Sequence, residues 1–100
     1  MKISIIITFY SNKTMLLHCL QALYNTIKNK SNIEIILVND NPTIDLSFIY
    51  KEYKNKFDIM ILNMSENGGY SKACNYGIEH SKYNDVIVIL SLKKTGLKKC

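Results

Sequence analysis

Four short runs of apolar residues, rich in Ile and Val, punctuate the chain. They cover residues 3–7, 33–38, 59–62 and 86–90. None of the runs alternates regularly between apolar and polar residues. Continuous β-branched runs of this length are typical of strands that are buried on both faces of a parallel sheet. The pattern therefore predicts four such strands.

The segments between the runs carry apolar residues at the spacing of three and four that is typical of a helix. Ser11, Asn12 and Thr14 are candidates for the N-cap of the first helix. The three predicted apolar stripes are Leu16, Cys19, Leu20, Leu23 and Ile27; Leu46, Ile49, Tyr50 and Tyr53; and Ala73, Cys74, Gly77 and Ile78.

Alternation of strands and helices predicts an α/β fold with three layers and right-handed crossovers. We expect a parallel four-strand sheet in the order 3-2-1-4, with the first two helices on one face and the third on the other. The switch point then lies between the first and fourth strands. Residues 91–100 break the pattern, so we expect a domain over residues 1–90 followed by an irregular basic tail.

Composition is that of a globular protein, because 47% of the 100 residues are hydrophobic and 21% are charged. The formal net charge is +5. Much of the excess comes from the end of the chain, at Lys93, Lys94, Lys98 and Lys99. Nucleic-acid-binding domains usually carry a continuous basic stripe instead, so we expect no nucleic-acid partner.

The three cysteines, Cys19, Cys74 and Cys100, are far apart and form no CxxC pair. This usage favours a reducing compartment over a disulfide framework. The first apolar run is too short for a secretory signal, and no segment approaches the ~20 apolar residues of a membrane helix. We therefore expect a cytoplasmic location and no transmembrane segment.

Ligands of open α/β sheets bind beyond the carboxyl ends of the strands, so the loops after the strands are the candidate sites. Asp40 can accept a hydrogen bond from a base or a ribose, or it can simply form a turn. Tyr10 can stack on a base or pack at the sheet edge. Residues 67–69 can offer N–H groups to a phosphate or merely start the third helix. We could identify no catalytic set.

Three segments, in this order, resemble family 2 glycosyltransferases. Residues 3–10, followed by L-x-x-C-L at residues 16–20, are similar to the opening strand of that family. Residues 34–43 resemble its E-I-I-V-V-D-D-G-S-T segment, and residues 67–78 resemble its N-x-G-x-x-x-A-x-N-x-G-I segment. The resemblance implies the N-terminal half of a Rossmann-like GT-A fold. This half binds a nucleoside diphosphate sugar, uridine- or thymidine-linked, for transfer to a glycan or another acceptor.

The resemblance also implies roles for individual residues. Thr8 and Tyr10 would hold the base, and Asp40 would bond the base or the ribose. Asn67 and Gly68 would shape the wall of the pocket. Lys72 or Asn75 would lie near the phosphates.

The chain departs from the family pattern at three places. Asn39 stands where Asp is usual, and Asn41-Pro42 replaces Gly-Ser. Ser91-Leu92-Lys93 occupies the place of the family's Asp-x-Asp, whose carboxylates hold Mg²⁺ or Mn²⁺ in a complete domain. We therefore expect no metal cofactor and no catalytic residue in this chain, and no sugar transfer by the chain alone.

Two other functions stay open at this point. The chain can be a non-catalytic nucleotide- or partner-binding α/β module, or a flavodoxin-like regulatory domain. We also expect the fourth strand to leave an exposed edge through which copies of the chain associate.

Overall fold

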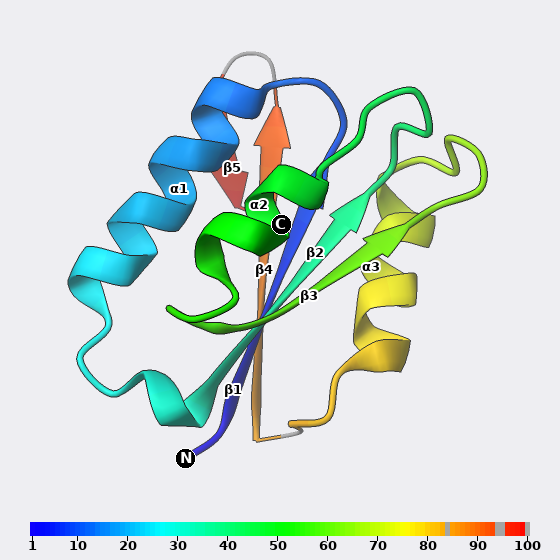
Figure 1. Ribbon diagram of the computed structural model, residues 1–100. Coiled ribbons are helices and arrows are strands. Elements are labelled where there is room, and N and C mark those ends of the chain that lie inside the picture. Colours follow the sequence, from blue (N-terminus) through cyan, green and yellow to red (C-terminus); the bar gives the residue numbers. More distant parts are fainter. Residues whose placement is uncertain (84, 94–95, 100) are drawn as a thin grey trace.

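The computed structural model describes residues 1–83, 85–93 and 96–99 (Figure 1). Strands and helices alternate from the N-terminus. The elements are β1 (Ile3–Phe9), α1 (Lys13–Thr26), the 3₁₀ turn η1 (Lys30–Asn32), β2 (Ile33–Asn39), α2 (Ser47–Tyr53), β3 (Asp58–Asn63), α3 (Tyr70–His80), β4 (Val86–Lys93) and β5 (Gly96–Lys99).

The strands form one sheet in the order β3-β2-β1-β4-β5. The first four strands are all parallel, with Ile3 opposite both Ile33 and Val86. The predicted order 3-2-1-4 is confirmed. The chain moves outward from β1 to β3 and then returns to pair β4 with the other side of β1, so the switch point lies between β1 and β4, as predicted.

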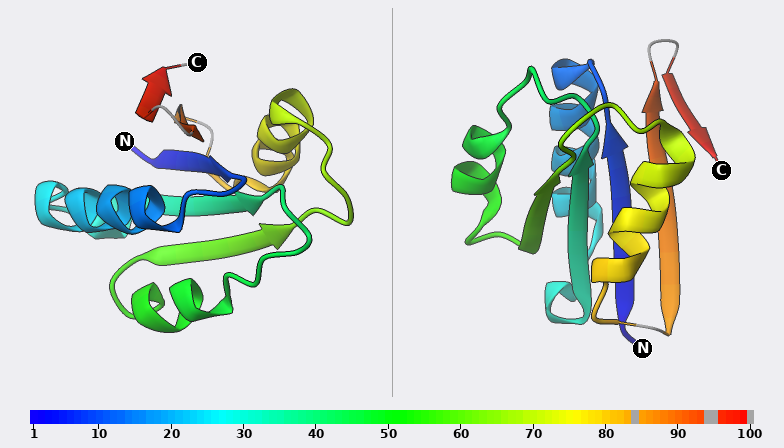
Figure 2. Two further views of the ribbon diagram at one scale, coloured as in Figure 1. Left: turned by 90° about the horizontal axis from the view of Figure 1, so that it is seen from above. Right: turned by 90° about the vertical axis from the view of Figure 1, so that its right-hand side faces the viewer.

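Helices cover both faces of the sheet (Figure 2). On one face, α1 and α2 enclose the larger apolar core, which includes Leu16 and Leu20 of α1 and Ile49 of α2. On the other face, α3 packs through Ala73 on Ile6 and other apolar residues of β1 and β2. The predicted distribution of the helices is confirmed. Within the described part of the chain, no helix is long and apolar enough to cross a membrane.

Burial on both faces is complete only for the two inner strands. Every residue of β2 is buried, and β1 is buried from Ser4 to Phe9. The prediction of two-sided burial is wrong for β3 and β4. Ile87 and Val88 of β4 are 37% and 38% exposed, and as neighbours in a strand they lie on opposite faces of the sheet.

The helices lie where they were predicted, but two residues assigned to buried helix faces are exposed. Asn12 is the N-cap of α1, accepting a hydrogen bond from the Met15 N–H at 3.0 Å. Tyr50 and Ile78, which were assigned to the buried stripes, are exposed. Both lie at the margin of their helix face, where the spacing of three and four does not decide burial.

The end of the chain is not irregular as expected. β4 continues to Lys93, and β5 pairs with it antiparallel over Leu90–Lys93. The short antiparallel strand β5 pairs with backbone groups at the edge of β4. The side-chain pattern of this lysine-rich segment did not predict a strand. Lys94 and Cys100 lie outside the described residues, while Cys19 and Cys74 are free thiols.

Candidate functional site

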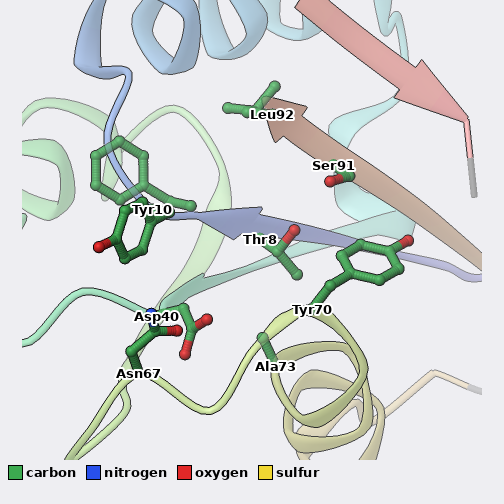
Figure 3. A pocket seen from close by; sticks show the side chains of 9 residues that line it. Thr8, Tyr10, Asp40, Asn67, Tyr70, Ala73, Ser91 and Leu92 are labelled. Carbon is green, nitrogen blue, oxygen red and sulfur yellow. The ribbon is translucent and has the colours of Figure 1, made fainter. Parts of the chain in front are cut away.

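A cavity of about 230 Å³ opens at the carboxyl edge of the sheet, next to the switch point (Figure 3). It lies between the ends of β1, β2 and β4 and the first turn of α3. Its lining combines hydroxyl, amide and carboxylate groups with aromatic and aliphatic surface. The lining residues are Thr8, Phe9, Tyr10, Asp40, Asn67, Tyr70, Ala73, Ser91 and Leu92.

Four of the five site residues predicted from the sequence line this cavity. Thr8 and Tyr10 come from β1 and its loop, Asp40 from the end of β2, and Asn67 from the loop between β3 and α3. Gly68 does not line the cavity but contributes a backbone N–H behind it. Lys72 and Asn75, which the resemblance placed near the phosphates, are not among the lining residues.

Asp40 fastens the loop that precedes α3. Its Oδ1 accepts a hydrogen bond from the N–H of Gly68 at 2.8 Å, and its Oδ2 accepts one from Gly69 at 3.1 Å. Gly69 has φ +86°, a left-handed conformation that glycine adopts without strain. A carboxylate has about four lone-pair sites, so these two bonds leave Asp40 able to accept another from a ligand.

Tyr10 is held in place through its backbone. The side-chain amide of Asn41 donates to the Tyr10 carbonyl at 2.8 Å, and the Asp40 N–H donates to the Phe9 carbonyl at 2.8 Å. Tyr10 as a residue is 49% exposed and lines the cavity. The turn after β2 therefore helps to position an aromatic residue at the cavity.

Asn39 stands where the family usually has Asp, and its side-chain amide makes three hydrogen bonds within the loops. Its Nδ2 donates to the carbonyl of Ile44 at 2.7 Å and to Oδ1 of Asn63 at 3.1 Å. Its Oδ1 accepts from the N–H of Asn41 at 3.0 Å. The amide thus ties the loop after β2 to the end of β3, and it needs both of its donor hydrogens to do so.

Tyr70 and Ser91 line the cavity although the sequence did not mark them as ligand-binding residues. Tyr70 follows directly after Gly69 and opens α3, so its place at the site follows from the predicted loop. Ser91 is the Cα partner of Thr8 in the parallel register of β4 with β1. The predicted strand ended at residue 90, but β4 continues to Lys93, and its register brings Ser91 beside Thr8.

A second hollow, of about 460 Å³, lies between α1 and β4. Its walls are mainly apolar, with Met15, Leu23 and Leu90 among them. Burial raises the pKa of the Cys19 thiol in its wall, and burial likewise raises the pKa of the Cys74 thiol in α3. Burial therefore favours the neutral thiol over the thiolate at both positions.

The residues around the cavity do not fit the divalent metal that the resemblance implies. Ser91 and Leu92 stand where the metal-binding carboxylates are usual, and Asp40 is the one carboxylate among the lining residues. Among the described residues, no three His, Cys, Asp or Glu side chains form a group that could hold a metal ion.

The fold and the cavity define the class. This is an open α/β sheet covered on both faces, with a cavity beside its switch point. The family model of glycosyl transferase family 2 matches residues 4–91, and the chain belongs to that family. The probable glycosyltransferase YdaM of Bacillus subtilis is 31% identical over 101 residues, covering 97% of this chain and 24% of that protein.

Solved structures show the same fold at lower identity. S. aureus TarS 1–349 in complex with UDP-GlcNAc matches with a TM-score of 0.80 and 23% identity, covering 91% of this chain and 26% of that chain. Mannosyltransferase PcManGT from Pyrobaculum calidifontis, in complex with GDP-Man and Mn²⁺, has a TM-score of 0.76 and 15% identity, with 90% and 27% covered. The architecture is thus part of a GT-A fold, and the chain spans about a quarter of the length of these proteins.

Proposed function

We propose that this chain forms the nucleotide-binding part of a glycosyltransferase. The cavity takes the nucleoside portion of a uridine- or thymidine-diphosphate sugar, whose sugar is destined for a glycan or another acceptor. The observation that carries the proposal is convergence, because Thr8, Tyr10 and Asp40 come from two strand ends 30 residues apart and line one cavity. TarS, which shares the fold, was solved with UDP-GlcNAc and with UDP.

Each residue has a role that its geometry supports. The exposed face of Tyr10 can stack on a base, a contact worth about 1–3 kcal/mol. Asp40 is buried and already fixed by two backbone donors, so it can accept an N–H or O–H of the ligand without first losing side-chain freedom. Asn67 closes the same side of the cavity.

The chain alone is expected to bind the nucleotide without transferring the sugar. Ser91 and Leu92 provide no carboxylate where the family holds its metal, and the lining residues include no His and only one carboxylate for proton transfer. The alternative function, a nucleotide-binding module without catalysis, rests on the same observation. The two differ only in whether a donor sugar is ever cleaved.

Calorimetry with UDP tests the binding role. Asp40→Ala should weaken binding by about 1–3 kcal/mol, because the lost acceptor leaves a ligand donor unpaired and releases the loop at Gly68 and Gly69. Asp45→Ala is the matched control, since it removes an exposed carboxylate whose partner is the N–H of Ser47 on the far side of the turn.

Three outcomes are informative. Lack of binding by UDP and dTDP would contradict the proposal. Equal affinity of wild type and Asp40→Ala would reduce Asp40 to a turn residue. Hydrolysis of UDP-GlcNAc by the chain with added Mn²⁺ would show that the expected loss of activity is wrong.

A further inference from the structure

A buried carboxylate lies at the amino end of the sheet, opposite the edge that carries the cavity. Glu34 is 3% exposed, and one of its oxygens, Oε2, accepts three hydrogen bonds. The donors are the hydroxyl of Ser4 at 2.6 Å, the N–H of Lys82 at 2.7 Å and the N–H of Tyr83 at 3.2 Å. The carbonyl of Tyr83 lies 3.1 Å from the same hydroxyl. These four residues form the amino-end cluster.

The amino-end cluster joins the sheet to the connection between α3 and β4. Ser4 and Glu34 are Cα partners in the register of β1 with β2. Lys82 and Tyr83 follow the end of α3, where the chain returns to the amino edge of the sheet (Figure 2). Hydrogen bonds from backbone N–H groups to a carboxylate are charge-assisted and therefore strong. Glu34 thus fixes the chain shortly before β4 begins at Val86.

The side chains of β4 do not specify its register by themselves. The residues from Val86 to Leu90 are all aliphatic, so a strand shifted by one residue still presents an aliphatic side chain at each of these places. A shift of one residue turns every side chain to the other face of the sheet. In the observed register Ser91 is the partner of Thr8, and a shift by one residue would put Leu90 or Leu92 there instead. The residues that β4 contributes to the cavity therefore depend on what fixes this register.

We infer that Glu34 is a positioning residue, which sets the register of β4 on β1 and so brings Ser91 to the cavity. The carboxylate holds Tyr83, and only two residues separate Tyr83 from Val86, the first residue of β4. The strand carries this constraint from Val86 to Ser91, a distance of roughly 17 Å at the usual rise per residue. The register is a property of the fold, and only its consequence for the cavity rests on the proposed function.

Nuclear magnetic resonance of the isotopically labelled chain reads the register directly, without a ligand. Contacts between backbone protons of β1 and β4 should join Thr8 to Ser91 in the wild type. In Glu34→Ala, a second set of contacts should join Thr8 to Leu90 or Leu92. Glu34→Gln keeps an oxygen at the same reach and should restore the single wild-type set. Wild-type contacts alone in a folded Glu34→Ala chain would overturn the inference.

Two control variants separate the register from other effects. Asp85→Ala removes an exposed carboxylate that accepts the N–H of Lys2 at 3.0 Å, directly before β4. Ile36→Ala removes buried apolar volume from the face of β2 that also carries Glu34, and it lowers stability without removing a member of the amino-end cluster. Both variants should keep the wild-type contacts. A changed register in either of them would contradict a specific role of Glu34.

Hydrogen exchange on the unaltered chain gives a test that does not depend on whether Glu34→Ala folds. The amides of Lys82 and Tyr83 should exchange within about tenfold of the rate of those β4 amides that bond β1, because the cluster and the strand should open together. Faster exchange of Lys82 and Tyr83 would show that the cluster opens while β4 stays paired, and it would overturn the inference.

Calorimetry with UDP tests the consequence for the cavity. Glu34→Ala should weaken UDP binding by about 2- to 10-fold, because Leu90 or Leu92 replaces Ser91 beside Thr8 in part of the molecules, and Glu34→Gln should bind as the wild type does. A changed register with unchanged UDP affinity would overturn the role of Glu34 at the cavity. If the wild type binds no UDP, the proposed function is wrong, and the resonance contacts still decide the register.

Discussion

At Asn39, a single amide decides the geometry of the candidate site. The side chain is fully buried, and its two N–H groups face the carbonyl of Ile44 and the Oδ1 of Asn63. Its position directly before Asp40 means that the same bonds fix the direction in which Asp40 leaves β2. The surrounding acceptors therefore match the amide of Asn39 in place of the usual Asp. Substituting Asp for Asn39 should lower the free energy of unfolding.

Asn39→Asp should destabilise the chain by about 1–3 kcal/mol near neutral pH, because a carboxylate cannot donate to the Ile44 carbonyl. The Asn63 amide can turn to offer its NH₂ group, whereas a backbone carbonyl cannot. The loss should be smaller at pH 4, where protonation of the introduced carboxyl restores one donor. Urea unfolding at both pH values measures this, with Asn75→Asp on the exposed side of α3 as the control.

Equal stability of Asn39→Asp and wild type at pH 7 would show that the loop re-forms around a charged residue. A loss that does not depend on pH would show that the donated bonds are not its cause.

Residues that line the cavity were predictable from the loops after the strands together with the family resemblance. Thr8, Tyr10, Asp40 and Asn67 line it. The two hydrogen bonds that Asp40 accepts from Gly68 and Gly69 were not predictable from the sequence. They join loops 28 residues apart and depend on the pairing of β2 with β3. The contribution of Ser91 depends in the same way on the register of β4 with β1.

On the scale of the elements, Gly77 sets the distance between α3 and the sheet. A Cβ built on Gly77 would lie 2.6 Å from Cγ2 of Ile6 and 3.1 Å from Cγ2 of Val38. Both partners are fully buried side chains of the inner strands, so they have little room to move. The sequence predicted Gly77 as part of a helix face, and the structure shows that the face requires the absence of a side chain.

Gly77→Ala should therefore destabilise the chain by about 1–3 kcal/mol through overpacking, although Ala is the better helix former by about 1 kcal/mol. Because α3 carries Tyr70 and Ala73 of the cavity, the shift should also weaken UDP binding. Thermal unfolding and calorimetry measure the two effects. Glu79→Ala, on the exposed side of the same helix, should leave both nearly unchanged. A stabilised Gly77→Ala variant would show that α3 is free to move away from the sheet.

The elements themselves were largely predictable from local patterns. Continuous apolar runs marked the four parallel strands, and helical spacing marked the three helices in their correct layers. β5 was missed because its pairing with β4 is a tertiary event that leaves no apolar pattern in a lysine-rich segment. The predicted stripe of the second helix began at Leu46, which is the N-cap of α2, and Asp45 accepts a hydrogen bond from the Ser47 N–H.

On the scale of the whole molecule, the sheet has two ends of different character. At one end, β3 forms the margin of the sheet, with α2 packed against it. At the other end, β5 pairs with Leu90–Lys93 only. Val86–Ile89 pairs with β1 on its inner side, and its outer side has no partner strand among the described residues. Ile87 and Val88 expose β-branched side chains on both faces of that same segment. Backbone donors and apolar side chains are therefore available together at one place.

An unpaired edge with exposed apolar residues is a template for pairing with another chain, so we predict that this chain self-associates through residues 86–89. Val88→Lys should reduce the association, because a charged side chain on an edge strand disfavours edge-to-edge pairing. Light scattering on size-exclusion fractions should show a lower mass for the variant at the same concentration, with the midpoint of association moved by about tenfold or more.

The opposite edge supplies the control. Met60 of β3 is exposed to a similar degree, and Met60→Lys introduces the same charge at the other end of the sheet. This variant should associate as the wild type does if β4 is the contact. Loss of association only in Met60→Lys would place the contact at β3, and a wild-type chain that stays monomeric at high concentration would contradict the prediction. In that last case β5 alone would suffice to protect the β4 edge, even though its pairing covers only half of the strand.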